Sequence, residues 1–205
     1  AGYSNTTGDQ HTALGQNALF SNNTGDSNTA LGSDSMYTNT TGHGSVAIGR
    51  GALYSNTSGI NNIAIGPYSA ASATAALFSN TTGSYNIALG KGALHSNTTA
   101  ANNTAVGYQA GYSNTTGERN TSFGFQAFRV NTTGSNNTAI GYEANANNTT
   151  GNYNVSLGLQ SLLNNTTADN NTAVGYQALL ASTTGHSNTA VGSLAGDAIT
   201  TGYQN

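Results

Sequence analysis

Residues 103–119 read NTAVGYQAGYSNTTGER, and this 17-residue unit decides the fold because the chain copies it from end to end. The glycine of the NTAVG segment, called the marker glycine below, returns every 17 residues, with one interval of 24. It stands at positions 15, 32, 49, 66, 90, 107, 124, 141, 158, 175 and 192. The residue that ends NTTG keeps the same period from position 8 to position 202. The chain therefore contains about twelve copies of one unit, with a seven-residue insertion within 67–78.

Apolar and small residues alternate just ahead of each marker glycine, and this period-2 pattern predicts a short β-strand. Such a strand is too short to be stable alone, but stacked copies can hydrogen-bond their neighbours and bury a shared core. Asn, Gly and Thr supply the turns. We predict an all-β parallel β-solenoid, or β-roll, of about twelve 17-residue coils forming a single domain over 1–205. A helical repeat is disfavoured because Gly, Asn and paired Thr interrupt every unit.

Two rows of equivalent positions carry the packing predictions. The residue before the marker glycine is always apolar, and we expect this pre-glycine row to form the core: Leu14, Leu31, Ile48, Ile65, Leu89, Val106, Phe123, Ile140, Leu157, Val174 and Val191. The residue before that is always Ala or Ser, and we expect this small row to permit close contact: Ala13, Ala30, Ala47, Ala64, Ala88, Ala105, Ser122, Ala139, Ser156, Ala173 and Ala190. The partner in that contact is either the opposite wall of a narrow coil or another chain.

Charge is scarce, at 5% of residues with a formal net charge of −3. The Lys and Arg residues are scattered, whereas nucleic acids and anionic membranes need them clustered. No run of about 18 apolar residues predicts a membrane span, and the chain has no cysteine for disulfides or thiolate metal sites. We therefore expect no nucleic-acid partner and no membrane span.

The acidic residues and the histidines do not recur in one row, so the repeat predicts neither a catalytic group nor a set of metal ligands. Asp9 and Asp26 come nearest to a carboxylate pair on adjacent coils, and an exposed turn explains them equally well. We predict a protein that is not an enzyme and has no cofactor.

The NTTG turn holds ten N-x-[ST] sequons, which makes periodic N-glycosylation one interpretation. The candidate residues are Asn5, Asn22, Asn39, Asn56, Asn80, Asn97, Asn114, Asn131, Asn148 and Asn165. The alternative is a ladder in which the asparagine amides bond from coil to coil. The ladder is favoured, because parallel strands lie only about 4.8 Å apart, which crowds glycans on successive coils.

The segments NTALG, SVAIG, NIAIG and NTAVG resemble the NSVAIG repeats in the head domains of YadA-type trimeric autotransporter adhesins. NTAVGYQAL followed by NTTG also resembles repeat arrays in some phage tail-fibre-like proteins. The resemblance implies a left-handed, usually trimeric β-roll in extracellular fibres that bind surfaces. The 17-residue period is longer than is usual in those heads, and no coiled-coil stalk is visible.

These observations predict a structural subunit of an extracellular fibre or filament, at a cell or virion surface, with adhesin-like binding to a glycan or protein receptor. We expect self-association, as a homotrimer or as an end-to-end filament, since six residues between positions 205 and 1 would continue the register of a longer array. The alternatives are an ice-binding β-solenoid, suggested by the paired threonines, and a receptor-binding phage tail-fibre shaft. Exposed tyrosines such as Tyr108, Tyr142 and Tyr176 could stack on sugars, although packing between chains is favoured.

Overall fold

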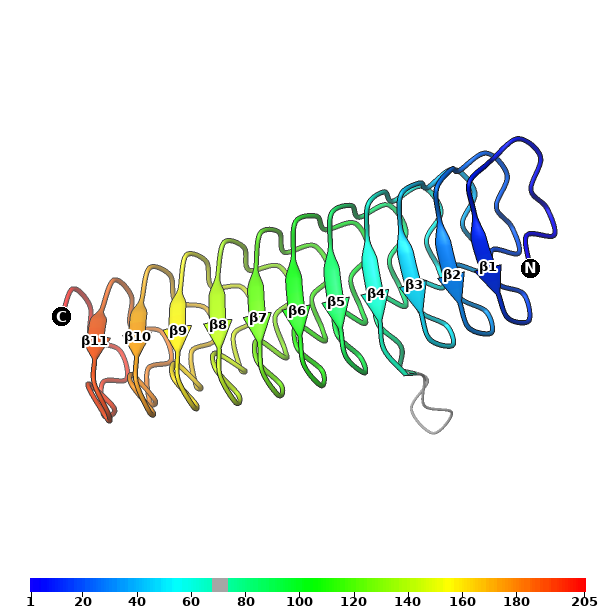
Figure 1. The fold of residues 1–205 in the computed structure, drawn as a ribbon. Coiled ribbons are helices and arrows are strands. Elements are labelled where there is room, and N and C mark those ends of the chain that lie inside the picture. Colours follow the sequence, from blue (N-terminus) through cyan, green and yellow to red (C-terminus); the bar gives the residue numbers. More distant parts are fainter. Residues whose placement is uncertain (68–73) are drawn as a thin grey trace. The chain divides into compact units, whose positions relative to one another are not determined.

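The computed structural model describes residues 1–67 and 74–205, and it divides them into two compact units, 1–103 and 104–205. No described residue lies in a helix, and all eleven strands are three residues long. Both units have the same construction: each coil contributes one strand, and the strands lie side by side in chain order (Figure 1). The prediction of an all-β parallel solenoid with a 17-residue period is confirmed.

Unit 1 holds five parallel strands paired in register. They are β1 (Thr12–Leu14), β2 (Thr29–Leu31), β3 (Val46–Ile48), β4 (Ile63–Ile65) and β5 (Ile87–Leu89). The 24-residue interval falls between β4 and β5, which still pair Ile65 with Leu89. The coil is back in register at Leu77, whose N–H donates to the carbonyl of Ala93. The predicted insertion therefore lies between these strands, although residues 68–73 are outside the described part.

Unit 2 holds six parallel strands, also in register. They are β6 (Thr104–Val106), β7 (Thr121–Phe123), β8 (Thr138–Ile140), β9 (Val155–Leu157), β10 (Thr172–Val174) and β11 (Thr189–Val191). Equivalent residues pair along the whole unit, so each row of the sequence becomes a row of side chains in space.

Turns form the rest of each coil, and they hold residue types that seldom take positive φ. Besides the marker glycines, three rows are left-handed, as in Gln126 (52°), Phe128 (55°) and Asn136 (59°). This conformation costs about 1–2 kcal/mol for a residue with a side chain. Hydrogen bonds between coils hold it in place: the N–H of Phe128 donates to the Ala144 carbonyl at 2.9 Å.

The marker position requires glycine both for its positive φ and because two coils approach each other closely there. Gly141 has φ of 136°, and a Cβ there would lie 2.4 Å from the carbonyl oxygen of Gly158 in the next coil. The marker glycine is therefore a point of close approach between coils as well as a turn residue.

The predicted core is wrong, because the pre-glycine row lies on the outside of the sheet. Leu14, Phe123 and Val191 are 71%, 54% and 69% exposed, and the rest of the row is exposed or half-buried. In each strand the middle residue points inward, so its two neighbours point outward. The inward residue belongs to the small row, whose members in β2 to β10 are buried.

The core instead combines the small row with two rows that follow the marker glycine. The third residue after it is Ala or Ser, and among the described residues it is buried in each coil except the last. The fourth forms the leucine row, and in the coil with the insertion it is replaced by Leu77, eleven residues after Gly66. This leucine row holds Leu19, Met36, Leu53, Leu77, Leu94, Gly111, Phe128, Asn145, Leu162, Leu179 and Gly196. Around β8, for example, Phe128 packs with Ala127, Ala139 and Ala144. The small row thus meets the opposite wall of its own narrow coil, which leaves it no surface for another chain.

The described residues include no helix of the length and hydrophobicity needed to span a membrane.

Candidate binding surfaces

The asparagines of the NTTG turns form a buried ladder, which confirms the structural interpretation of this row. Asn131 Nδ2 donates to Asn114 Oδ1 at 2.7 Å and to the Gly134 carbonyl at 3.0 Å. Its Oδ1 accepts from Asn148 Nδ2 at 3.1 Å. The same pattern joins Asn22, Asn39 and others in unit 1. Both hydrogens of such an amide are therefore donated in hydrogen bonds inside the protein.

The glycosylation prediction is wrong at nine of the ten sequons. Their side chains are no more than 1% exposed: Asn22, Asn39, Asn56, Asn80, Asn97, Asn114, Asn131, Asn148 and Asn165. A glycan would replace a hydrogen on the buried Nδ2 and has no room there. Asn5 alone is exposed, and a glycan at that residue stays a prediction.

A second asparagine ladder, which the sequence reasoning missed, precedes the strands. Asn137 Oδ1 accepts from the backbone N–H of Asn154 at 2.9 Å. Its Nδ2 donates to the Gly151 carbonyl at 2.9 Å and lies 3.2 Å from Asn120 Oδ1. This strand-asparagine row comprises Asn28, Asn62, Asn86, Asn103, Asn120, Asn137, Asn154, Asn171, Asn188 and Asn205. The sequence signal for this second ladder is the Asn of NTAVG, which recurs as regularly as the Asn of NTTG.

Asn145 is a buried amide without a hydrogen-bond partner. Asn145 stands in the leucine row with 0% exposure, and neither Nδ2 nor Oδ1 has a hydrogen-bond partner. Leaving a buried polar group unpaired costs about 1–3 kcal/mol. Its backbone explains why asparagine is tolerated, since φ is 49° and Asn takes the left-handed region more readily than most residues.

Replacing Asn145 with leucine is expected to stabilise the protein by about 2 kcal/mol, because it removes the unpaired amide and adds apolar contact. Leu162, in the same row of the next coil, already takes φ of 51°. Urea denaturation followed by circular dichroism measures the change. Asn170→Leu is the control, since it introduces leucine at φ of 60° on an exposed turn and should give no gain. An equal gain in both variants would contradict the explanation.

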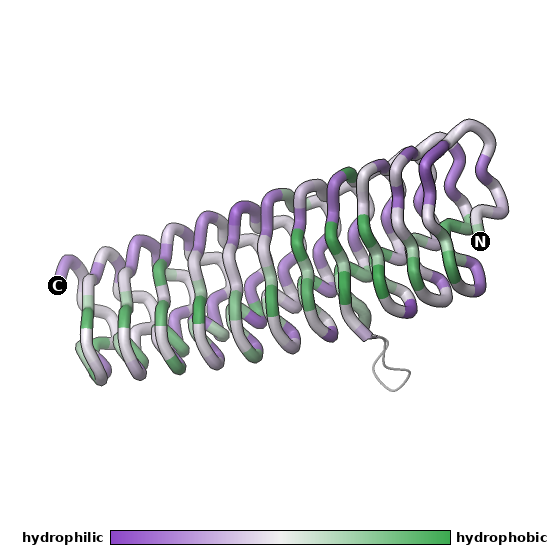
Figure 2. The backbone as a smooth tube through the Cα atoms, viewed as in Figure 1, coloured by the Kyte–Doolittle hydropathy of each residue, from purple (hydrophilic) through white to green (hydrophobic). Residues whose placement is uncertain are grey.

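In both units the outer face of the sheet carries an unbroken row of apolar residues. Besides the pre-glycine row, the residues two places earlier are Thr, Val or Ile and also face outward. In unit 2 the row after the marker glycine adds Tyr108, Phe125, Tyr142, Leu159 and Tyr176, each 38–48% exposed. The strands carry the hydrophobic colours in Figure 2. Contiguous apolar surface of this kind marks sites of protein–protein contact.

Aromatic side chains stack along both units. In unit 1 the rings of Tyr3, Phe20, Tyr37, Tyr54, Phe78 and His95 form an aromatic ladder with centroids 5.1–5.5 Å apart. In unit 2, Phe125 stacks between Tyr108 and Tyr142, 5.1 Å from each. Because neighbouring rings cover both faces of an interior ring, a sugar cannot lie flat on it. Packing between coils is therefore one role of these rings.

The paired threonines of the NTTG turn are not equivalent. The first donates to the carbonyl of the next coil, as Thr132 Oγ1 does to Thr149 at 3.0 Å. The second, as at Thr133, is exposed. Only one of the two rows therefore presents its hydroxyl groups to water.

The acidic residues and histidines do not gather in the described ranges 1–67 and 74–205, where no three of them could hold one metal ion. The side chains of Asp26 and Asp169 instead accept backbone N–H groups of the preceding coil. Burial lowers the pKa of His95, although the nearby Ala75 carbonyl opposes the shift.

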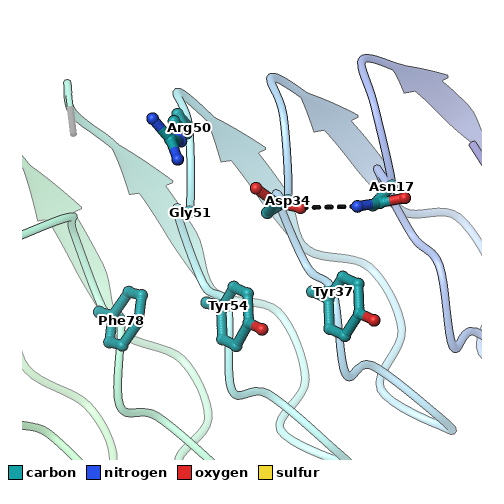
Figure 3. Close-up of a pocket in the computed structure, with 7 residues that line it drawn as sticks. All are labelled: Asn17, Asp34, Tyr37, Arg50, Gly51, Tyr54 and Phe78. Carbon is teal, nitrogen blue, oxygen red and sulfur yellow. Dashed lines mark hydrogen bonds between the residues drawn. The ribbon is translucent and has the colours of Figure 1, made fainter. Parts of the chain in front are cut away.

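A hollow of about 420 Å³ opens beside the aromatic ladder in unit 1 (Figure 3). Tyr37, Tyr54 and Phe78 line one side. Asn17, Asp34, Arg50 and Gly51 line the other. Asn17 Nδ2 donates to Asp34 Oδ1 at 3.0 Å, and Ser33 Oγ donates to Asp34 Oδ2 at 2.9 Å. Burial, followed by the charges at Tyr37 and Asp34, raises the pKa of Tyr54.

Comparison with known proteins finds no family model that matches the chain and no match among curated proteins or solved structures. The functional argument therefore depends on the surfaces described above.

Proposed function

We propose that this protein is a non-catalytic structural module of an extracellular fibre, with adhesin-like surface binding, and that copies of it associate through the outer face of the sheet. The observation that carries the proposal is the pre-glycine row: every member is apolar, yet the core is complete without it. The row is still Leu, Ile, Val or Phe in every coil, where an ordinary solvated face would be polar.

The repeat itself favours another copy of the chain as the occupant of this face. The row repeats with the spacing of parallel strands, about 4.8 Å, so a partner that covers it must present contacts at the same interval. A second copy of the chain has the same repeat and therefore presents contacts at this interval. The outward residues of the strands include no charged side chain, so equal strand surfaces meet without repulsion. Association between copies would bury the row and give the trimer that the resemblance to adhesin heads implies.

This proposal is better supported than ice binding. An ice-binding face needs regular small side chains, whereas the outer face mixes Phe123 and Leu157 with Val106 and Val174. At the turn, the hydroxyl of the first threonine is already engaged. The phage tail-fibre shaft is a variant of the same fibre role, and its extracellular setting rests on the same resemblance.

The mass of the protein in solution tests the assembly. We expect light scattering after size-exclusion chromatography to give a multiple of the 20.6 kDa chain mass, three chains if the resemblance holds. The double variant Phe123→Glu/Leu157→Glu places charges on two outward residues that are 54% and 43% exposed. It should yield monomers with an unchanged circular dichroism spectrum, because desolvating unpaired charges opposes association.

The matched control is Thr133→Glu/Thr167→Glu, which adds the same charge at exposed turn positions and should keep the assembly. A wild-type chain that is monomeric at all concentrations, or an assembly indifferent to both double variants, would contradict the proposal.

A further inference from the structure

We propose that the hollow in unit 1 is a carbohydrate-binding site that accepts one or two sugar rings through their hydroxyl groups. A sugar would then be the ligand in the surface binding that the proposed function includes. The inference rests on the proposed function for that link alone. All seven residues given as its lining belong to unit 1.

One row contributes a glycine to the lining of the hollow. The second residue after the marker glycine is Asn17, Asp34 and then Gly51. In unit 2 the same row includes Gln109, Gln126, Glu143, Gln160 and Gln177. Hydrogen bonds of 2.9–3.0 Å, donated by side-chain amides, join several of these residues from coil to coil. Gly51 places no side chain in this row, and it lines the hollow opposite the aromatic ladder.

The polar side of the hollow is pre-organised. The bonds from Asn17 and Ser33 fix the Asp34 carboxylate, and a carboxylate oxygen can accept more than one hydrogen bond. Adjacent sugar hydroxyls can therefore donate to Asp34. The Arg50 guanidinium carries five N–H donors and lines the same space.

The aromatic side completes the match to a sugar. The stacked Tyr37 and Tyr54 rings, 5.1 Å apart and 4° from parallel, hold their hydroxyl groups in a row (Figure 3). Phe78 brings an apolar edge for the C–H groups of a sugar ring. The volume of about 420 Å³ lies in the range of about 300–1,000 Å³ typical of small-molecule sites.

Other ligand classes match the lining less well. A hard cation needs six or more oxygen ligands, and Asp34 is the one carboxylate among the residues that line the hollow. A phosphate would meet the same carboxylate beside a single arginine. A large apolar ligand would have to bury the Asp34 and Arg50 charges, which is costly.

Saturation-transfer difference NMR on the whole chain tests the site. The probes are free methyl glycosides of glucose, galactose, mannose and N-acetylglucosamine, and the acids glucuronate, galacturonate and N-acetylneuraminate. We expect at least one sugar to bind. Gly51→Gln should weaken it at least tenfold, because glutamine fills the hollow as it fills this row in unit 2, where it already takes positive φ. Asp34→Asn should weaken it to a similar degree and still accept the bond from Asn17.

Glu143→Gln is the control, since it alters the same row in unit 2 and should leave binding unchanged. If Gly51→Gln does not fold, Asp34→Asn decides the question alone. Absence of signal from every sugar, or binding that survives both unit 1 variants, would overturn the proposal. The result is separable from the proposed assembly, because a monomeric chain that binds sugar contradicts only the assembly, and an assembled chain that binds none contradicts only the site.

Discussion

The Asn137→Ala variant is expected to lose about 3–5 kcal/mol of unfolding free energy. Asn137 is 1% exposed, and its side chain serves three coils. Its removal leaves the Asn154 N–H without a partner and withdraws one of two side-chain donors from the Gly151 carbonyl, which keeps the bond from Asn148 Nδ2. It also withdraws a donor from Asn120 Oδ1. Each hydrogen bond lost to a group that keeps another partner costs about 1 kcal/mol. Each buried group left unpaired costs about 1–3 kcal/mol, and the rigid spacing of the coils gives the neighbours little freedom to find replacements.

Urea denaturation followed by circular dichroism measures the loss, and hydrogen exchange locates it. Both are needed because repeat proteins can unfold in parts. Asn137→Ser should recover part of the loss, because Ser45 occupies this row naturally and its Oγ accepts the Asn62 N–H at 3.1 Å. Thr133→Ala, at an exposed turn position, is the control. An unchanged urea midpoint for Asn137→Ala would mean that the ladder contributes nothing to stability.

Most of the fold could be predicted from the 17-residue period. A 17-residue repeat of strand and turn residues permits few arrangements, and the alternation before the marker glycine located every strand. The alternation could not say which face of the strand is inside. We assigned the bulky face to the core because apolar burial usually dominates stability, and the narrow coil reverses that assignment.

The true core was harder to see because its row is irregular. Leucine alternates there with Gly111, Asn145 and Gly196, and its left-handed backbone is not one that leucine suggests. Sequence patterns also do not distinguish a surface sequon from a buried amide. Asn131 belongs to an N-x-[ST] sequon, yet its side chain is part of the buried ladder. The hollow at Gly51 depends on rows that lie three residues apart in sequence but face one another across a coil, which only the fold reveals.

The Ala139→Leu variant is expected to lose about 3 kcal/mol of unfolding free energy. Ala139 is fully buried against Phe128, Ala127 and Ala144, and the opposite wall cannot move away without breaking the hydrogen bonds between coils. Overpacking a filled core costs about 1–3 kcal/mol, and the upper end applies where the backbone is held on every coil.

Its counterpart is Ile140→Ala, one residue along the same strand. If the pre-glycine row formed the core, that truncation would cost about 2–5 kcal/mol, and an added leucine at 139 would lie on the surface. The structure predicts the reverse order, with a loss below about 1 kcal/mol for Ile140→Ala, because the side chain is only partly buried. Both substitutions belong in the Phe123→Glu/Leu157→Glu background, where association does not contribute to the measured stability. If Ile140→Ala proves the more damaging there, the small row is not the inside of the coil.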